Sequence, residues 1–221
     1  MIVTLDGPAG SGKSKAAEGL AVRLGWLHLN TGAMYRAVTL AALRRGLDLA
    51  DGAALAALAA SDALTFRPGV VLIDDAAPGE ELRSHAVNEA IKRVADWPAV
   101  RAALVARQQR IAHDVDLVTE GRDQGTVVFP QAELKVYLTA SREVRAARRF
   151  AEERERRPGI TLAAVLAEQD RRDVDDRSRA VGALRMPADA VELDTDHLSR
   201  EAVVDRLVAL VAERRHGRRE R

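Results

Sequence analysis

The chain opens with Ile2-Val3-Thr4-Leu5-Asp6 and continues directly into Gly7-Pro8-Ala9-Gly10-Ser11-Gly12-Lys13-Ser14. The first five residues are mostly apolar and β-branched, which is typical of a short buried strand. The next eight match the phosphate-loop pattern G-x-x-x-x-G-K-[ST] at every position. Helical periodicity then runs from Lys13 to Leu24, and Gly25 ends it. A strand, a glycine-rich turn and a helix in this order predict an α/β protein that binds a nucleoside triphosphate.

Each residue type in this loop has a chemical purpose. Glycines let the backbone turn tightly so that several N–H groups point at phosphate, and the helix that starts here adds its positive end. Lys13 is expected to place an ammonium near the β- and γ-phosphates and to act in catalysis, while the Ser14 hydroxyl is the expected Mg²⁺ ligand. The candidate cofactor-binding residues are Gly7, Pro8, Ala9, Gly10, Ser11, Gly12, Lys13, Ser14 and Lys15.

The rest of the chain alternates between strand and helix patterns. The expected elements are a strand at 26–29, a helix at 31–43 capped by Thr31, a helix at 53–60, a hairpin of 63–67 and 70–73 around Pro68-Gly69, a helix near Glu89, a helix at 98–111, strands at 115–119 and 134–139, helices at 141–156 and 161–177, a strand at 190–193 and a last helix with Val203, Val204, Leu207, Val208 and Val211 on one face. This alternation predicts a three-layer α/β fold of the phosphate-loop type, with a parallel sheet of five strands covered by helices on both faces.

Composition limits the class of protein. Hydrophobic residues make up 47% and charged residues 30% of the 221, a balance typical of one globular domain over 1–221. The absence of cysteine excludes disulfides, cysteine zinc sites and thiol nucleophiles. The longest apolar run, 53–60, is shorter than the roughly 20 residues that span a bilayer, and the N-terminus has no leader pattern. We expect a cytoplasmic protein.

Arginines suggest a second anion site. Arg36 lies near an expected helix start, Arg122 directly follows an expected strand, and Arg172, Asp176 and Arg179 have the spacing of one helix face. The alternatives are surface ion pairs for the last three, a solvated helix residue for Arg36 and a simple Arg122–Asp123 pair. The formal net charge is +1, and residues 142–179 hold 11 arginines against 9 acids, which argues against nucleic-acid or membrane partners. A balanced cluster of this kind suits a mobile lid.

Several motifs together resemble the bacterial-type cytidylate kinases, members of the nucleoside monophosphate kinase group. The resemblance runs from Ile2 to about Ala212. Besides the loop, it rests on Asn30-Thr31-Gly32-Ala33-Met34-Tyr35-Arg36, Trp97-Pro98-Ala99-Val100-Arg101, Gly121-Arg122-Asp123-Gln124-Gly125-Thr126-Val127-Val128-Phe129-Pro130 and Arg177-Ser178-Arg179-Ala180. Residues 63–97 match the extra subdomain that lies near the acceptor site in this family, and 145–172 match its helical lid.

The resemblance implies that ATP, with Mg²⁺, phosphorylates CMP and dCMP to CDP and dCDP. It implies that Arg36, Arg122 and Arg179 hold the acceptor phosphate, and that Arg172 and Asp176 face the ribose. Thr31 and Tyr35 would stand near the acceptor, and Arg101 and Asp123 would read the cytosine edge. Arg148, Arg154 and Arg157 would be the lid arginines around the transferring phosphoryl group. Small members of the family are usually monomers, so we expect a monomer.

Base reading by Arg101 and Asp123 also makes chemical sense. A carboxylate accepts from the cytosine N4 amino group, and a guanidinium donates to the N3 and O2 acceptors. The chain departs from the family at Lys92, where a serine near the amino group is frequent, so selectivity loosens if Lys92 points inward. The remaining alternatives are a kinase for UMP or dTMP and a regulatory protein that binds nucleotide without acceptor-stimulated turnover.

Overall fold

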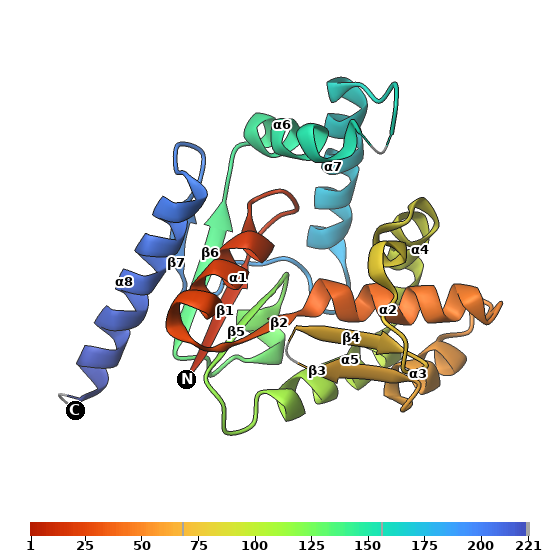
Figure 1. Cartoon of the computed structure of the whole chain (residues 1–221), viewed down its shortest axis with the longest axis horizontal. Coiled ribbons are helices and arrows are strands. Elements are labelled where there is room, and N and C mark those ends of the chain that lie inside the picture. The colour runs from red at the N-terminus through yellow and green to blue at the C-terminus, as the bar shows by residue number, and fades with distance from the viewer. Residues whose placement is uncertain (68, 156, 220–221) are drawn as a thin grey trace. The chain divides into compact units, whose positions relative to one another are not determined.

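The N-terminal strand β1 (Ile2–Asp6) occupies the centre of a five-stranded sheet (Figure 1). The strand order is β2-β5-β1-β6-β7, in which the other strands are β2 (Leu27–Asn30), β5 (Leu117–Gly121), β6 (Leu134–Thr139) and β7 (Val191–Asp194). β1 pairs with β6, and β6 with β7, in parallel, so that Leu5 lies opposite Val136 and Val136 opposite Val191. The predicted five-stranded parallel α/β sheet flanked by helices is confirmed.

The computed structural model describes residues 1–67, 69–155 and 157–219. Pro68 of the expected hairpin turn and Arg156 of the expected lid lie outside the described residues. The chain divides into two compact units. The first combines Met1–Trp26 with Val118–Arg221, and the second is Leu27–Leu117, which contains the expected insert.

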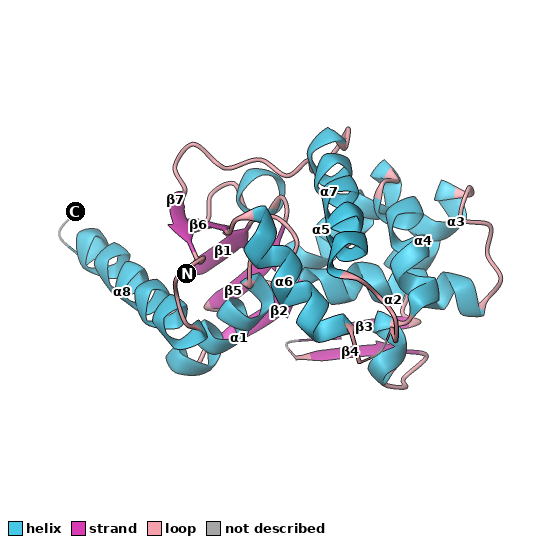
Figure 2. Cartoon of the chain, turned by 90° about the horizontal axis from the view of Figure 1, so that it is seen from above, coloured by secondary structure: helices cyan, strands magenta, loops and turns pink. Residues whose placement is uncertain are grey.

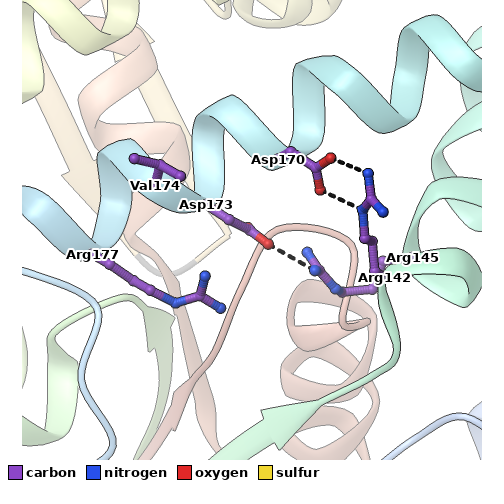
Figure 3. Close-up of a pocket in the computed structure, with 6 residues that line it drawn as sticks. All are labelled: Arg142, Arg145, Asp170, Asp173, Val174 and Arg177. Atoms are coloured by element: carbon purple, nitrogen blue, oxygen red, sulfur yellow. Dashed lines mark hydrogen bonds and ion pairs between the residues drawn. The ribbon is translucent and has the colours of Figure 1, made fainter.

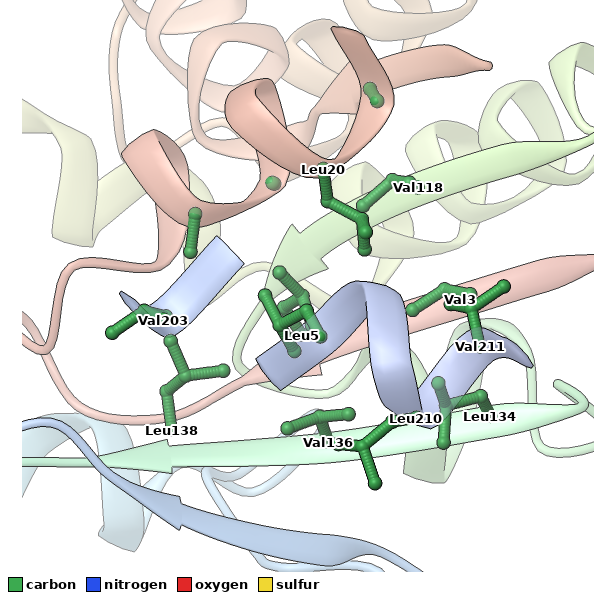
Figure 4. Packing of buried hydrophobic residues seen from close by; sticks show 14 residues of the cluster. Val3, Leu5, Leu20, Val118, Leu134, Val136, Leu138, Val203, Leu210 and Val211 are labelled. Carbon is green, nitrogen blue, oxygen red and sulfur yellow. The ribbon is translucent and has the colours of Figure 1, made fainter. Parts of the chain in front are cut away.

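The core of the first unit lies between its sheet and two helices, α1 (Lys13–Leu24) and α8 (Arg200–Arg219) (Figure 4). Alternate side chains of β1 and β6 point to this face, because successive residues of a strand face opposite sides. The buried cluster comprises Val3, Leu5, Ala16, Ala17, Leu20, Ala21, Val118, Leu134, Val136, Leu138, Val203, Leu207, Leu210 and Val211. Burying this apolar surface contributes roughly 25 cal/mol per Å² and holds the phosphate loop at the end of β1.

Two arginine-rich helices of the first unit, α6 (Arg142–Glu153) and α7 (Leu162–Ser178), pack against each other (Figures 1 and 2). Both helices begin at side-chain caps: Ser141 Oγ accepts from Val144 N, and Thr161 Oγ1 accepts from Ala164 N. The expected helices at 141–156 and 161–177 are therefore present, although the first ends at Glu153.

The second unit is mainly helical. Its helices α3 (Gly52–Ala60) and α5 (Pro98–Ile111) pack together, as do α2 (Thr31–Arg44) and α4 (His85–Ala95). Strands β3 (Leu64–Arg67) and β4 (Val70–Ile73) form the predicted antiparallel hairpin beside α2, followed by the 3-10 turn η1 (Gly79–Arg83). The expected helix from Pro98 to Ile111 has these bounds, with Pro98 in its first turn, where a missing N–H costs nothing.

Three local predictions need correction. The cap of α2 is Asn30, whose side chain accepts from Ala33 N, so Thr31 is already helical. Strand β5 begins and ends two residues later than expected, and it includes Glu120, a charged residue that is nevertheless buried. The turn that follows contains a short π-helix, η2 (Gln124–Val128), which the sequence pattern did not predict.

Candidate active site

The phosphate loop has a backbone that only glycine adopts without strain at its first position. Gly7 has a φ of 147°, and a Cβ there would lie 2.1 Å from the carbonyl oxygen of Leu138 on β6. Any side chain would therefore force β1 and β6 apart at the point where the loop begins. The close approach explains why the pattern starts with glycine here, at the carboxyl end of the central strand.

Lys13 folds back over this loop. Its Nζ donates to Pro8 O at 2.6 Å and to Ser11 Oγ at 3.4 Å, and the residue is 5% exposed. Burial lowers the pKa of Lys13 well below its usual value, and the charge of Arg122 lowers it further. The negative charges of Glu120 and Asp176 act in the opposite direction and raise this pKa. The negative charge of a bound polyphosphate would stabilise this buried ammonium, as expected for a loop that binds phosphate.

Ser14 meets a carboxylate that the sequence pattern did not single out. Its Oγ donates to Glu120 Oε1 at 2.8 Å, and Glu120 is 5% exposed at the end of β5. A hydroxyl beside a carboxylate is a donor set of hard oxygen ligands that Mg²⁺ accepts. The described residues contain no cluster of three or more acidic, histidine or cysteine side chains suited to a metal, so any Mg²⁺ here would also need ligands from phosphate and water.

Asp6, at the end of β1, anchors the turn that carries Asp123. Its Oδ1 accepts from Gln124 N at 2.9 Å and its Oδ2 from Gly125 N at 2.7 Å. Burial raises the pKa of Asp6 to about 6, and the nearby Asp123 adds to the rise, although the two backbone N–H groups and Lys13 oppose it. Asp123 itself is 4% exposed and therefore shielded from solvent.

Arg122 pairs with a distant acid and not with its neighbour Asp123. Its Nε donates to Asp176 Oδ2 at 2.6 Å, and Arg179 Nη2 donates to Asp176 Oδ1 at 3.2 Å. Burial of Asp176 opposes its ionisation, yet Arg122, Arg172 and Arg179 hold its pKa at about 2. Asp176 is buried on α7, so the alternative of a solvated surface ladder is wrong. Arg179 lies just beyond the end of α7 rather than on its helical face.

The remaining acceptor-site candidates belong to the second unit. Arg36 Nη1 donates to Asn88 Oδ1 at 2.8 Å and to Leu82 O at 3.0 Å, so residues of the expected insert hold it. The guanidinium of the buried Arg101 lies over the ring of Tyr35, 5.5 Å from its centroid, a cation–π arrangement. Thr31 is buried at the start of α2, and Lys92 is exposed on α4.

The three lid arginines differ in their surroundings. Arg148 donates to Thr195 Oγ1 at 3.0 Å and to Thr195 O at 2.6 Å, and that hydroxyl lies 3.3 Å from the loop carbonyl of Ser11. Arg157 is paired with Glu153 and Glu168. Arg154 is exposed, and its guanidinium has no hydrogen bond or ion pair within the described ranges. The structure brings Arg148 to the base of the phosphate loop and leaves the other two near the far end of α6.

A pocket of about 420 Å³ lies between α6 and α7, lined by Arg142, Arg145, Asp170, Asp173, Val174 and Arg177 (Figure 3). Two ion pairs cross it. Arg142 is joined to Asp170 through two hydrogen bonds, and Arg145 Nη2 donates to Asp173 Oδ2 at 2.7 Å. The sequence motifs do not single out Arg145, Asp173, Asp6 or Glu120. The signal available for Glu120 was its position just before Gly121-Arg122-Asp123, and for Asp6 its position just before the loop.

No helix in the described part of the chain is both long and apolar enough to cross a membrane.

Comparison with known proteins identifies the family. The sequence profile described as "Cytidylate kinase" matches residues 3–213. The cytidylate kinase of Rhodococcus jostii (strain RHA1) is 47% identical over 221 residues, which cover 97% of this chain and 96% of that protein. The cytidylate kinase of Rhodopirellula baltica (strain DSM 10527 / NCIMB 13988 / SH1) is 43% identical over 213 residues, covering 96% and 93%. A solved structure of an uncharacterized protein from Eubacterium ventriosum (ATCC 27560) shares the fold, with a TM-score of 0.54 at 9% identity and coverage of 96% and 98%. A family match over nearly the whole chain, together with these identities, shows that the chain belongs to the cytidylate kinase family.

Proposed function

We propose that this protein transfers the γ-phosphoryl group of ATP to CMP and dCMP, producing ADP and CDP or dCDP. The observation that carries the proposal is the second set of cations in the first unit. The charges of Arg122 and Arg172 lower the pKa of the Lys13 ammonium, so both guanidinium groups lie near it, and Asp176 holds Arg122 there through a hydrogen bond. A loop that binds a donor triphosphate therefore has arginines beside it that suit the phosphate of an acceptor.

The attacking atom is an oxygen of the acceptor phosphate, which is already ionised near neutral pH. No side chain has to remove a proton from it, so catalysis rests on alignment and on neutralising negative charge. The new bond joins this oxygen to the γ-phosphorus, and the bond from the γ-phosphorus to the β,γ-bridging oxygen breaks as ADP leaves. Lys13 would hold the donor phosphates, and Arg36, Arg122 and Arg179 would hold the acceptor phosphate.

Ser14 would be the protein ligand of Mg²⁺, with Glu120 orienting the serine hydroxyl or a metal-bound water. When bound, Mg²⁺ neutralises charge on the donor phosphates. The hydrogen bond between Ser14 and Glu120 supports this assignment, because it places a hydroxyl and a carboxylate together at the end of the phosphate loop.

The lid would exclude water from the transferring group, which otherwise reacts with water in place of the acceptor. Arg148, Arg154 and Arg157 are its proposed cations. Arg148 is already fixed to Thr195, so its role would be to hold the base of the lid at the loop. Arg154 and Arg157 would meet the phosphates when the helical hairpin closes, and Arg157 would first have to leave Glu153 and Glu168.

Selection of cytosine would come from Arg101 and Asp123. Uracil presents a carbonyl where cytosine presents its amino group, so Asp123 would face an acceptor and remain unpaired. The loss is on the order of 2–4 kcal/mol, or about 30- to 1000-fold in kcat/KM. Arg172 and Asp176 would contact the sugar, and Thr31 and Tyr35 would border the acceptor. We also propose that the reaction takes place in the cytoplasm, where ATP and CMP are dissolved. The protein would act as a monomer, without nucleic-acid or membrane partners.

The test follows ADP release with Mg-ATP and CMP, dCMP, UMP, AMP or dTMP in parallel. Strong turnover with CMP and dCMP only would support the proposal and the base-reading pair together. Comparable turnover with UMP or dTMP would retain the kinase and overturn the cytosine selectivity, with Lys92 as the first residue to exchange. Binding of ATP without any acceptor-dependent ADP release would overturn the kinase proposal in favour of a regulatory role.

A further inference from the structure

Arg145 makes three hydrogen bonds that connect separate parts of the first unit. Its Nη1 donates to Ala9 O of the phosphate loop at 3.0 Å, its Nε to Ala140 O at 3.1 Å, and its Nη2 to Asp173 Oδ2 at 2.7 Å. The residue is 5% exposed. Its backbone also packs against the loop, because a Cβ at Gly10 would lie 3.2 Å from Arg145 O. One guanidinium therefore joins the donor loop to helix α7.

On α7, Asp173 lies one turn before Asp176, and both acids are buried. Asp176 receives hydrogen bonds from Arg122 and Arg179, the arginines proposed to hold the acceptor phosphate. The connection thus runs from Ala9 through Arg145 to Asp173, then along one helical turn to the Asp176 cluster. Asp173 Oδ1 is buried and has no hydrogen-bond partner among the described residues, so this carboxylate depends on Arg145 alone for a direct countercharge.

A second ion pair between the same helices lacks this connection. Arg142 and Asp170 also join α6 to α7, and Figure 3 shows the two pairs side by side. The Arg142 and Asp170 side chains are 51% and 38% exposed, against 6% for both members of the buried pair. Within the described residues, the Asp170 carboxylate hydrogen-bonds to Arg142 and makes no hydrogen bond to the phosphate loop. The exposed pair therefore serves as a control for the mere joining of two helices.

We propose that Arg145 is a positioning residue that couples the donor loop to the acceptor arginines through Asp173. The inference rests on the proposed function and adds two residues to it. A shift of the loop when the donor triphosphate binds moves the Ala9 carbonyl, and the guanidinium must follow or lose its hydrogen bond. Because breaking a buried pair leaves an uncompensated charge, Asp173 follows Arg145, and α7 carries the shift to Asp176.

The measurement is a linkage between two ligands. The affinity for CMP is measured by calorimetry with and without a Mg-bound, non-hydrolysable ATP analogue. The ratio of the two dissociation constants is the coupling factor, which for coupled sites lies at about 5–150. The variants are Asp173→Asn and Arg145→Lys, with Asp170→Asn as the matched control. Lysine retains the charge but cannot donate in three fixed directions as the guanidinium does.

We expect a coupling factor of at least about 5 in the unmodified protein and in Asp170→Asn. In Asp173→Asn and Arg145→Lys it falls to about 1–2, while CMP binding in the absence of the analogue changes by less than about threefold. A structural role alone would lower the thermal stability of Asp173→Asn and Arg145→Lys and leave the coupling factor intact. If one of the two test variants does not fold, as judged by circular dichroism, the other decides.

Three outcomes overturn the inference: a normal coupling factor in either test variant, an equal loss in Asp170→Asn, or a factor near 1 in the unmodified protein. The failure of the proposed function looks different, because it is the absence of CMP-dependent ADP release by the unmodified protein. That assay is run first. An active kinase without coupling overturns the role of Arg145 and leaves the proposed function in place.

Discussion

Ser14 Oγ and Glu120 Oε1 are joined by a 2.8 Å hydrogen bond, although 106 positions separate the two residues in the sequence. The bond ties the first turn of α1 to the end of β5, the strand next to β1 in the sheet. It places a buried carboxylate at the site where the sequence motif predicts a metal-ligating hydroxyl. A substitution at Glu120 therefore allows metal affinity to be measured separately from phosphate affinity at this loop.

Replacing Glu120 by Gln should raise the Mg²⁺ concentration needed for half-maximal activity by about 10-fold, as is typical when a group that orients a metal ligand is removed. The affinity for ATP in the absence of Mg²⁺ should change little, because the amide keeps the size and one acceptor oxygen. Mg²⁺ titrations of ADP release, together with ATP binding in chelator, give both values. An unchanged Mg²⁺ requirement would show that Glu120 only supports the serine structurally.

Replacing Lys13 by Ala should lower kcat by at least about 100-fold, because the buried ammonium is the loop's own charge on the donor phosphates. ADP release at saturating CMP is the measurement. Arg23→Ala is a suitable control, since Arg23 lies on the same helix with its side chain 55% exposed in an ion pair with Asp205. Near-normal turnover in Lys13→Ala would mean that the loop does not bind the transferring phosphate.

Replacing Asp123 by Ala should lower kcat/KM for CMP by about 30- to 1000-fold and that for UMP far less, because only cytosine offers an amino group to the carboxylate. Arg179→Ala provides the comparison. Since every nucleotide acceptor carries the same phosphate, that variant should lower kcat/KM for CMP and UMP by similar factors. Equal losses for both bases in Asp123→Ala would assign Asp123 to the structure of the turn instead of to base reading.

Asp6 should give the protein an unusual dependence of stability on pH. An unfolded aspartate has a pKa of 3.8, whereas burial raises the pKa of Asp6 to about 6, so the folded state holds an extra proton between these values. The free energy of unfolding should therefore decrease as the pH rises from about 4 to about 6, by up to about 3 kcal/mol from this group.

Urea denaturation of the unmodified protein and of Asp6→Asn across this pH range isolates the effect. The other carboxylates with shifted pKa values, such as Asp176, have lowered pKa values. They therefore make the free energy of unfolding increase with pH, mainly in a lower pH range. They contribute equally to both proteins. Curves that stay parallel from about pH 4 to about pH 6 would show that Asp6 is already ionised in the folded protein throughout.

Much of the fold was predictable because it depends on local patterns. The strand, loop and helix at 2–24, the start of α5 at Pro98, and β6 at 134–139 all follow from periodicity and from residues that begin or end helices. The errors arose where a polar side chain decides a boundary. Asn30 caps α2 in place of Thr31, and β5 continues through Glu120, which is buried and accepts a hydrogen bond from Ser14.

The acceptor-site candidates show that the spacing of residues along the sequence does not predict which distant side chains pair. Spacing placed Asp176 and Arg179 one turn apart, and they are in contact. It could not show that Arg122 would choose Asp176 over its neighbour Asp123, since that pairing joins residues 54 positions apart. The same holds for Tyr35 and Arg101, whose contact in the second unit depends on the packing of its helices.

The amino-acid sequence by itself determined that this protein has a phosphate loop on a parallel α/β sheet, because eight consecutive residues carry that geometry and the strand and helix on either side are local. Only the tertiary structure decided which groups interact: the charge of Arg122 acts on Lys13, Ser14 hydrogen-bonds to Glu120, and Arg145 joins Ala9 to Asp173. Desolvation and direct contact set the energies of buried charges, and both depend on which distant segments pack together.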